Sequence, residues 1–262
     1  MAIIGAGNMG SLIASRVINN LFAARDVFVT GHRQEKLEEL ARLGIQIEQD
    51  NRTAAGKSDV LLIAVKPKHM LDVCTEINDQ CNGKLVISIA AGITINAISR
   101  IIENAHIIRA MPNMAAAVGE SFTGLATRTA DEIEKAIVRS IFESFGKCEF
   151  FEEEKLDAIT GISGSGPAFL FYLAKAFIDI AVEANIDKEL ARAIAAQTML
   201  GAAKLISGDH RSLDEMITFV ASKGGTTEAG LAVADQLGLD HIMKRVLLQA
   251  IKRAEEIKKL ND

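Results

Sequence analysis

The first ten residues contain the feature that most constrains how this chain can fold. An apolar run ending at Ile4 is followed by Gly5, Gly7 and Gly10 in the spacing Gly-x-Gly-x-x-Gly. Helical periodicity begins directly afterwards, so the glycines are expected to join a strand to a helix. There Gly5 permits a tight turn, Gly7 lets the backbone approach a pyrophosphate, and Gly10 lets the helix pack on the strand. Because amides at a helix start attract anions, the segment predicts a dinucleotide site. A tight turn without a ligand is the alternative.

The end of the next predicted strand, over 26–30, bears on which dinucleotide binds. NAD-specific folds place an acidic residue there, about 20 residues past the glycines, to bind the ribose hydroxyls. This chain has Thr30, His32 and Arg33 instead. A hydroxyl, an imidazole and a guanidinium suit a ribose 2′-phosphate, which favours NADP and leaves NAD as the second choice. The alternative is that Arg33 only begins the next helix, over 34–43, on its solvated side.

Three further runs, over 60–65, 85–89 and 106–109, are almost wholly apolar, as parallel strands buried on both faces are. They end at Lys66 and Pro67, at Ala91, and at Asn113, and the carboxyl ends of parallel strands form the ligand-binding rim of an open sheet. Their alternation with helical segments predicts an α/β fold with a Rossmann-type doubly wound sheet. Strands over 122–126 and 148–151, around a helix over 131–145, are expected to close this domain.

The character of the chain changes near residue 152, where strands give way to alanine-rich helical stretches. We therefore predict an NAD(P)-binding domain over 1–152 and an all-α dimerisation and substrate domain over 153–262. The helix over 168–186 is apolar around most of its circumference and must be buried on most sides. Lys175, Asp179 and Glu183 make membrane insertion too costly. A partner subunit is expected to cover this helix and the one over 190–205.

Two loops of the second domain, over 163–167 and 222–227, are rich in glycine and in residues with hydroxyl groups, and each precedes a helix. Amides exposed at a helix start can bind a carboxylate. The commoner use of such residues is a hinge with an N-terminal cap. We favour carboxylate binding for the second loop, and the two interpretations weigh evenly for the first, which contains Ser163.

Charge and cysteine content exclude several classes of function. The 262 residues carry a net charge of −5, which argues against nucleic acid or an anionic membrane as a partner. Cys74, Cys81 and Cys148 have unrelated spacings that fit neither a disulfide framework nor a thiolate metal site, so no metal is expected. The chain begins with a strand rather than a basic and apolar leader. Together these features predict a cytoplasmic protein with reduced thiols.

Five motifs, in the family order, resemble pyrroline-5-carboxylate reductase, the last enzyme of proline biosynthesis. They are Gly-Ala-Gly-Asn-Met-Gly at 5–10, Ala-Val-Lys-Pro at 64–67, Arg-Ala-Met-Pro-Asn at 109–113, Ile-Ser-Gly-Ser-Gly-Pro-Ala at 162–168 and Ser-Lys-Gly-Gly-Thr-Thr at 222–227. The last two motifs are specific, whereas the first alone is not. The resemblance covers nearly the whole chain and implies a Rossmann domain followed by helices that interlock two subunits, with higher assemblies common in the family.

The resemblance also implies roles for individual residues. The cofactor residues that it adds to the glycines and strand ends are Asn8 and Met9 at the pyrophosphate, and Asn51, Ala64, Val65, Lys66 and Pro67 along the two riboses. The substrate residues lie on the second loop: the amides of Gly224, Gly225 and Thr226 for the carboxylate, Ser222 for the loop shape, and the Thr227 hydroxyl for the ring nitrogen. Thr227 is thus the expected catalytic residue, and Ser163 is an expected substrate contact.

The residue types in these motifs fit reduction of an imine. A ketone needs a proton donor in the transition state, usually His, Lys or Tyr, and no histidine lies in any motif. A cyclic imine can enter as a protonated iminium that is already electrophilic, so the enzyme need mainly hold it against the nicotinamide and exclude water. The expected reaction is hydride transfer from NAD(P)H to Δ1-pyrroline-5-carboxylate, which gives L-proline.

Two other functions remain open from the sequence. A 3-hydroxyacid-type dehydrogenase shares the combination of a Rossmann and a helical domain and uses a helical-domain lysine as acid, for which Lys175 is the candidate. A nucleotide-sensing module would bind NADP tightly without turnover and would give the loop over 222–227 no role.

Overall fold

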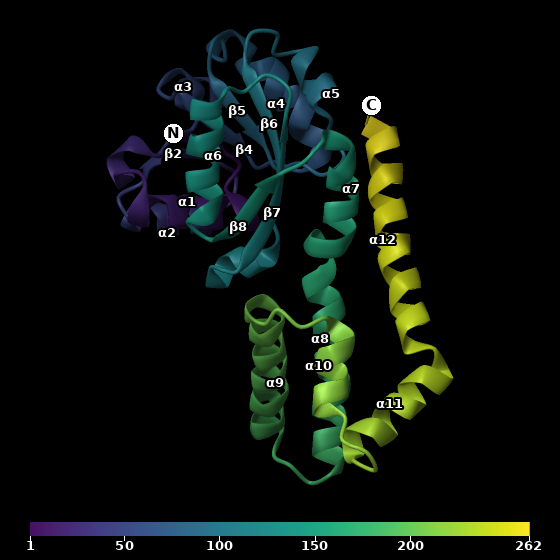
Figure 1. Ribbon diagram of the computed structural model, residues 1–262. Helices are drawn as coiled ribbons and strands as arrows, with labels where there is room; N and C mark the ends of the chain where they lie inside the picture. Colours follow the sequence, from purple (N-terminus) through teal and green to yellow (C-terminus); the bar gives the residue numbers. More distant parts are fainter. Residues whose placement is uncertain (262) are drawn as a thin grey trace. The chain divides into compact units, whose positions relative to one another are not determined.

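The structure, a computed structural model, describes residues 1–261 apart from the side chains of residues 19, 20 and 261. Its residues form two compact units. The first comprises Met1–Pro167 and Gln249–Asp262, and the second comprises Ala168–Leu248. Figure 1 shows a sheet flanked by helices in the first unit and only helices in the second. The predicted combination of a doubly wound α/β fold and a helical region is confirmed.

The first unit is built on one eight-stranded sheet with the strand order β3-β2-β1-β4-β5-β6-β7-β8. The strands are β1 (Ala2–Ile4), β2 (Phe28–Thr30), β3 (Gln46–Ile47), β4 (Val60–Ile63), β5 (Leu85–Ser88), β6 (His106–Met111), β7 (Ser121–Thr127) and β8 (Gly146–Phe150). The strands from β3 to β6 are parallel, and β7 pairs antiparallel with β6 and parallel with β8. The two strands expected to close the domain therefore run against the other six.

Helices cover both faces of the sheet, as the apolar strands require. One core cluster contains residues of α1 (Asn8–Asn20), α2 (Gln34–Arg42) and α6 (Glu132–Glu143). The other contains residues of α3 (Asn51–Gly56), α4 (Met70–Ile77), α5 (Ile95–Ser99) and α7 (Leu156–Ile159). Along β1, Ile3 packs into the first cluster while Ala2 and Ile4 pack into the second. This alternation places the strand ends, where the predicted cofactor residues lie, between two fixed layers.

Short helical turns connect these elements. They are 3-10 turns at Ala24–Asp26, Pro67–His69, Asn78–Gln80, Met114–Val118 and Glu153–Lys155, and a π-helical turn at Thr160–Gly164. The π-helical turn interrupts the path from α7 to α8 (Gly166–Glu183). Single π-helical turns of this kind occur often at functional sites.

The second unit consists of helices that leave much of their apolar surface uncovered in a single chain. They are part of α8, α9 (Lys188–Gly208), α10 (Leu213–Val220), α11 (Thr226–Leu237) and part of α12 (Leu239–Asn261). Phe171, Tyr172 and Phe219 are 71%, 78% and 75% exposed. By length and composition the helical stretch Glu153–Glu183 could cross a membrane, a property that core helices of soluble proteins share. The burial expected for α8 is therefore not found in the single chain.

The division between the units falls later than residue 152. Residues 153–167 stay with the sheet because Leu156 is buried in the second core cluster. The end of α12 belongs to the same unit: a Cβ at Gly92 would lie 2.6 Å from the Ile257 side chain, and Lys258 pairs with the buried Asp157. By its contacts, the segment after 152 therefore belongs partly to the sheet domain. A functional boundary at residue 152 stays a prediction.

Candidate dinucleotide site and substrate loop

The turn after β1 has the backbone geometry that the three glycines predict. Gly5 has φ +108°, which a side chain rarely permits, and a Cβ on Gly10 would lie 2.0 Å from the Gly5 carbonyl oxygen. The amides of Gly5 and Ala6 both donate to the carbonyl oxygen of Thr30, at 3.1 and 2.9 Å. The turn is thereby tied to the end of β2. Neither glycine can be replaced without moving the backbone.

The start of α1 is left available to an anion. Gly7 is the N-cap in an extended conformation, no side chain caps the helix, and the first turn has no acidic residue. Amides in the first turn of a helix have no partner within the helix, and the helix dipole adds positive potential there. The backbone of Asn8, Met9 and Gly10 therefore offers donors to a pyrophosphate.

Two side-chain contacts organise the end of β2. The Thr30 hydroxyl donates to Asn51 Oδ1 at 2.6 Å, and Asn51 Nδ2 donates to Glu76 Oε2 at 2.8 Å. Arg33 Nη1 donates to Asn8 Oδ1 at 2.8 Å, which places a guanidinium beside the first residue of α1. The predicted residues Asn8 and Arg33 thus come together, as do Thr30 and Asn51. His32, the other predicted residue here, is exposed.

The end of β4 packs directly on the glycine turn. A Cβ at Gly5 would lie 2.9 Å from the backbone of Ala64, and the Ala64 amide donates to the Ile4 carbonyl oxygen at 2.8 Å. Val65 is half-buried and Lys66 is exposed, and Pro67 begins the 3-10 turn that follows. This predicted strand end therefore lies at the glycine turn.

The ends of β5 and β6 supply the other two predicted cofactor residues. Ala91 is half-buried after β5, and Asn113 is 8% exposed after β6. Asn113 Oδ1 accepts from the Ala115 amide at 2.9 Å, and its Nδ2 donates to the carbonyl oxygen and the hydroxyl of Ser163 at 3.1 and 3.0 Å. Asn113 therefore connects the rim of the sheet to the π-helical turn.

Ser163 is already engaged by the protein itself. Its hydroxyl accepts from Asn113 and donates to the carbonyl oxygen of Phe122 at 3.0 Å. These contacts give the Ser163 hydroxyl a structural role that depends only on the chain itself. A substrate contact by Ser163 stays a prediction.

The second loop, in the helical unit, presents a helix start of the predicted kind. Gly224 has φ +73°, and Gly225 is the N-cap of α11, which begins at Thr226, two residues earlier than expected. No side chain caps α11 at Gly225, so the amides of Thr226 and Thr227 lie in an uncapped first turn. The Gly225 amide donates to the Ser222 carbonyl oxygen at 2.9 Å, which closes the loop.

Glu228, in the first turn of α11, contacts the loop and is a residue that the motifs do not reveal. Its Oε2 accepts from the Gly224 amide at 2.7 Å, so a carboxylate of the chain occupies one of the predicted substrate donors. An acid in the first turn of a helix commonly reaches back to a preceding amide, and that position was the available sequence signal.

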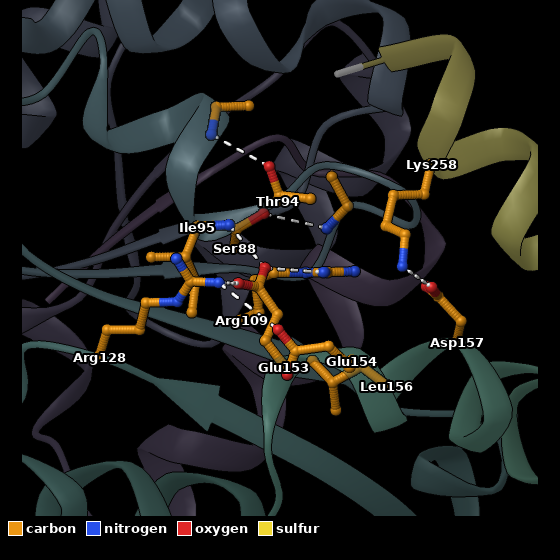
Figure 2. A network of polar contacts seen from close by, with 12 residues as sticks. Ser88, Thr94, Ile95, Arg109, Arg128, Glu153, Glu154, Leu156, Asp157 and Lys258 are labelled. Atoms are coloured by element: carbon orange, nitrogen blue, oxygen red, sulfur yellow. Dashed lines mark hydrogen bonds and ion pairs between the residues drawn. The ribbon is translucent and has the colours of Figure 1, made fainter.

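A buried ion-pair network lies beside the end of β6 (Figure 2). Glu153 Oε1 accepts from the Ile95 amide at 2.7 Å and from Arg109 Nη1 at 2.9 Å, and Arg128 Nη2 lies 3.1 Å from Glu153 Oε2. The side chains of Arg109 and Glu153 are 2% and 7% exposed. From sequence, Glu153 marked only a change of character in the chain. The structure makes it the partner of an arginine that precedes the strand end.

Thiolate and metal chemistry find no support among the described residues. Cys74, Cys81 and Cys148 are free and buried. Burial raises the pKa of the Cys74 thiol to about 12 and those of Cys81 and Cys148 to about 11, so all three stay protonated at neutral pH. Within the described chain, no group of three or more His, Cys, Asp or Glu side chains could hold a metal ion.

Lys175 is not tuned as a general acid in the single chain. Its ammonium is exposed and lies 2.6 Å from Asp179 Oδ2 on the same helix. The hydrogen bond that Lys175 donates to the Asp179 carboxylate raises the pKa of Lys175. A lysine that gives up a proton near pH 7 needs the opposite shift.

Comparison with known proteins assigns both parts of the chain. A family model described as pyrroline-5-carboxylate reductase dimerisation matches residues 153–257, and one described as NADP oxidoreductase, coenzyme F420-dependent, matches residues 1–92. The pyrroline-5-carboxylate reductase of Methanosarcina acetivorans is 34% identical, over 98% of this chain and 97% of that protein. The one from Synechocystis is 35% identical, over 99% and 98%.

Solved structures agree. A pyrroline-5-carboxylate reductase from Coxiella burnetii superposes with a TM-score of 0.90 at 34% identity, over 98% of this chain and 97% of that one. A Plasmodium falciparum pyrroline carboxylate reductase, solved with NADP bound, has the same fold, with a TM-score of 0.89 at 24% identity over 98% and 97%. Identity above 30% along the full length of its relatives, together with the five motifs, shows that this chain belongs to the pyrroline-5-carboxylate reductase family.

Proposed function

We propose that this chain reduces Δ1-pyrroline-5-carboxylate to L-proline with NADPH as the hydride donor and NADH as a second donor. The observation that carries the proposal is the full-length family match. The uncapped starts of α1 and α11 support it, because both can bind anionic groups of the cofactor and the substrate. The protein would act in the cytoplasm, where its three buried cysteines stay reduced. Nucleic acid and membranes are not expected partners, since the chain carries a net charge of −5.

The cofactor would bind along the carboxyl ends of the strands. The amides of Asn8, Met9 and Gly10 would hold the pyrophosphate. Gly7 would let the backbone approach it, while Gly5 and Gly10 keep the turn and the helix in place. The ribose contacts would come from Thr30, Asn51, Arg33 and His32, and the nicotinamide half would lie along Ala64, Val65, Lys66, Pro67, Ala91 and Asn113. When bound, NADPH supplies the hydride.

The substrate would bind on the second loop. The amides of Thr226 and Thr227 would hold its carboxylate at the start of α11, where the helix dipole favours an anion, because the Gly225 amide already donates to the Ser222 carbonyl oxygen. The Thr227 hydroxyl would hydrogen-bond the ring nitrogen and so orient the imine carbon. A protonated iminium needs no further acid, which agrees with an exposed, ion-paired Lys175.

The exposed apolar helices of the second unit would be covered by a second copy of the chain. Phe171 and Tyr172 on α8 are more than two-thirds exposed, and the dimerisation family match spans residues 153–257. Apolar surface of this extent is unfavourable in water. We therefore infer a homodimer through the C-terminal helices, from which higher oligomers can be built.

The test of the proposed function is NADPH oxidation by the purified protein with Δ1-pyrroline-5-carboxylate, with L-proline identified as the product. Turnover with this imine and none with 3-hydroxyacids supports the reductase. Oxidation of a 3-hydroxyacid that is abolished in Lys175→Ala would replace it with the dehydrogenase. Tight NADPH binding with no turnover of either class would favour the sensing module.

Arg33→Ala is expected to lower kcat/KM for NADPH at least about tenfold, because a charge-assisted hydrogen bond to a phosphate is worth roughly 1.5–3 kcal/mol. The value for NADH should change less than about twofold, since NADH has no phosphate for the guanidinium to bind. Steady-state kinetics with both cofactors measures the ratio. Arg42→Ala, at the far end of α2, is the matched control. An unchanged ratio in Arg33→Ala would contradict the assignment.

Glu228→Ala is expected to lower the KM for the imine about threefold while kcat stays constant. The substitution frees the Gly224 amide and removes a carboxylate that repels the substrate carboxylate at close range. Asp235→Ala, on the same helix, controls for loss of an acid from α11. A raised KM in Glu228→Ala would show instead that the contact holds the loop in its binding shape.

A further inference from the structure

A carboxylate reaches the end of β2 from a distant part of the chain. The residues that follow the strand contain no acid to bind a ribose hydroxyl, which favoured NADP in the sequence. In the structure Glu76, near the end of α4, accepts from Asn51 Nδ2 at 2.8 Å, and Asn51 Oδ1 accepts from the Thr30 hydroxyl at 2.6 Å. An acidic group is therefore linked to the strand end after all, through Asn51.

The carboxylate fixes the direction of every hydrogen bond in this chain of contacts. An ionised carboxylate can only accept, so Asn51 must turn its amide nitrogen toward Glu76 and its oxygen toward Thr30. Thr30, which is 3% exposed, must then donate its single hydroxyl proton to Asn51. Without Glu76 the Asn51 amide could rotate by half a turn and exchange donor for acceptor.

Among the described residues, no neighbouring cation neutralises the charge of Glu76 by an ion pair. The guanidinium of Arg52 donates through Nη1 to the backbone oxygen of Glu76 at 3.1 Å and pairs through Nη2 with Asp79. The Asp50 carboxylate accepts from the amides of Arg52 and Thr53 at the start of α3. Across residues 1–261 no ion pair to the Glu76 carboxylate forms, so its negative charge acts on whatever binds beside Asn51.

We propose that Glu76 narrows the preference for NADPH over NADH, by orienting Asn51 toward a free ribose hydroxyl and by opposing the attraction of Arg33 for a 2′-phosphate. A hydroxyl both donates and accepts, and Asn51 keeps one N–H and one oxygen lone pair to meet it. A phosphate only accepts and is repelled by the carboxylate. Glu76 is thus a positioning residue that acts through Asn51. The inference rests on the dinucleotide site of the proposed function.

Two substitutions separate the charge of Glu76 from its positioning role. Glu76→Gln keeps an acceptor for Asn51 and removes the charge. The KM for NADPH should therefore fall roughly threefold, as expected for one partly screened charge, and the KM for NADH should change little. The NADPH gain should shrink as ionic strength rises. Glu76→Ala also releases the Asn51 amide, so KM for NADH should rise about threefold or more, as for a lost hydrogen bond. In both variants kcat should stay within twofold.

The control is Glu132→Gln, which removes an exposed carboxylate of equal charge from α6, a helix of the other core cluster. An unchanged ratio of NADPH to NADH KM values in Glu76→Gln would overturn the proposal. The same shift in Glu132→Gln would also overturn it, because net charge would then be the cause. Melting temperatures of all variants identify a merely unfolded protein.

Failure of the proposed function can be distinguished from failure of this inference. If the wild-type protein turns over no imine, the dissociation constants of NADPH and NADH, measured by nicotinamide fluorescence, give the same selectivity ratio without catalysis. A shift of that ratio in Glu76→Gln supports the inference even then. Turnover by the wild type with an unshifted ratio in the variant rejects the inference alone.

Discussion

Thr227→Ala is expected to lower kcat for imine reduction about a hundredfold, the usual effect of removing one preorganised hydrogen-bond partner from a reacting group. Thr227 is the second residue of α11, where its hydroxyl and its amide both lie at the uncapped helix start. The substitution keeps the amide and removes only the partner of the ring nitrogen. Affinity for NADPH should therefore be unchanged, which fluorescence titration measures beside the steady-state rates.

Two neighbouring variants sharpen this result. Thr227→Ser restores a hydroxyl at the same carbon and should recover most of the rate. Thr226→Ala removes a hydroxyl one residue earlier while its amide, the group assigned to the substrate carboxylate, remains. Equal losses in Thr226→Ala and Thr227→Ala would show that the loop needs hydroxyls for its shape, and the assignment of Thr227 to the ring nitrogen would be abandoned.

Glu153→Ala is expected to destabilise the protein by about 3–5 kcal/mol, the usual cost of leaving a buried charge without its partner. Glu153 is the acceptor for the Ile95 amide and for Arg109, whose side chain is 2% exposed. Removing it takes that acceptor from the buried guanidinium of Arg109 and from the amide of Ile95, a residue of the second core cluster. Chemical denaturation measures the loss, and the melting temperature should fall by roughly 10 °C for a chain of this size.

Glu154→Ala is the matched control for this loss. The Glu154 side chain is 76% exposed and lies 3.7 Å from Arg128, so its removal should cost less than about 1 kcal/mol. If Glu153→Ala also lowers the free energy of unfolding by less than about 1 kcal/mol, water must replace the carboxylate as the partner of Arg109. Because Arg109 lies on β6 ahead of Asn113, destabilisation in Glu153→Ala should also weaken NADPH binding, whereas Glu154→Ala should not affect it.

The sequence by itself determined the elements whose cause is local. The backbone demands at Gly5 and Gly10 act within ten residues, so the turn between β1 and α1 follows from spacing alone. The apolar runs that became β4, β5 and β6 identify strands buried on both faces, because only helices on both sides can cover them. Family motifs added the identity of the chain, which full-length comparison confirmed.

The tertiary structure alone decided which distant residues meet. Asn51 joins Thr30 to Glu76 across three elements, and Asn113 joins the sheet to Ser163, at separations that no local pattern encodes. The antiparallel direction of β7 and the return of the end of α12 to the sheet unit are likewise set by packing.

The same limit explains why Glu153 and Glu228 could not be assigned from their positions. A carboxylate has the same sequence signature whether it is solvated or buried, and its role depends on the partner that folding brings to it. Local backbone and hydrophobic patterns therefore determined the elements and the cofactor turn. Long-range packing determined the polar contacts that orient the residues around them.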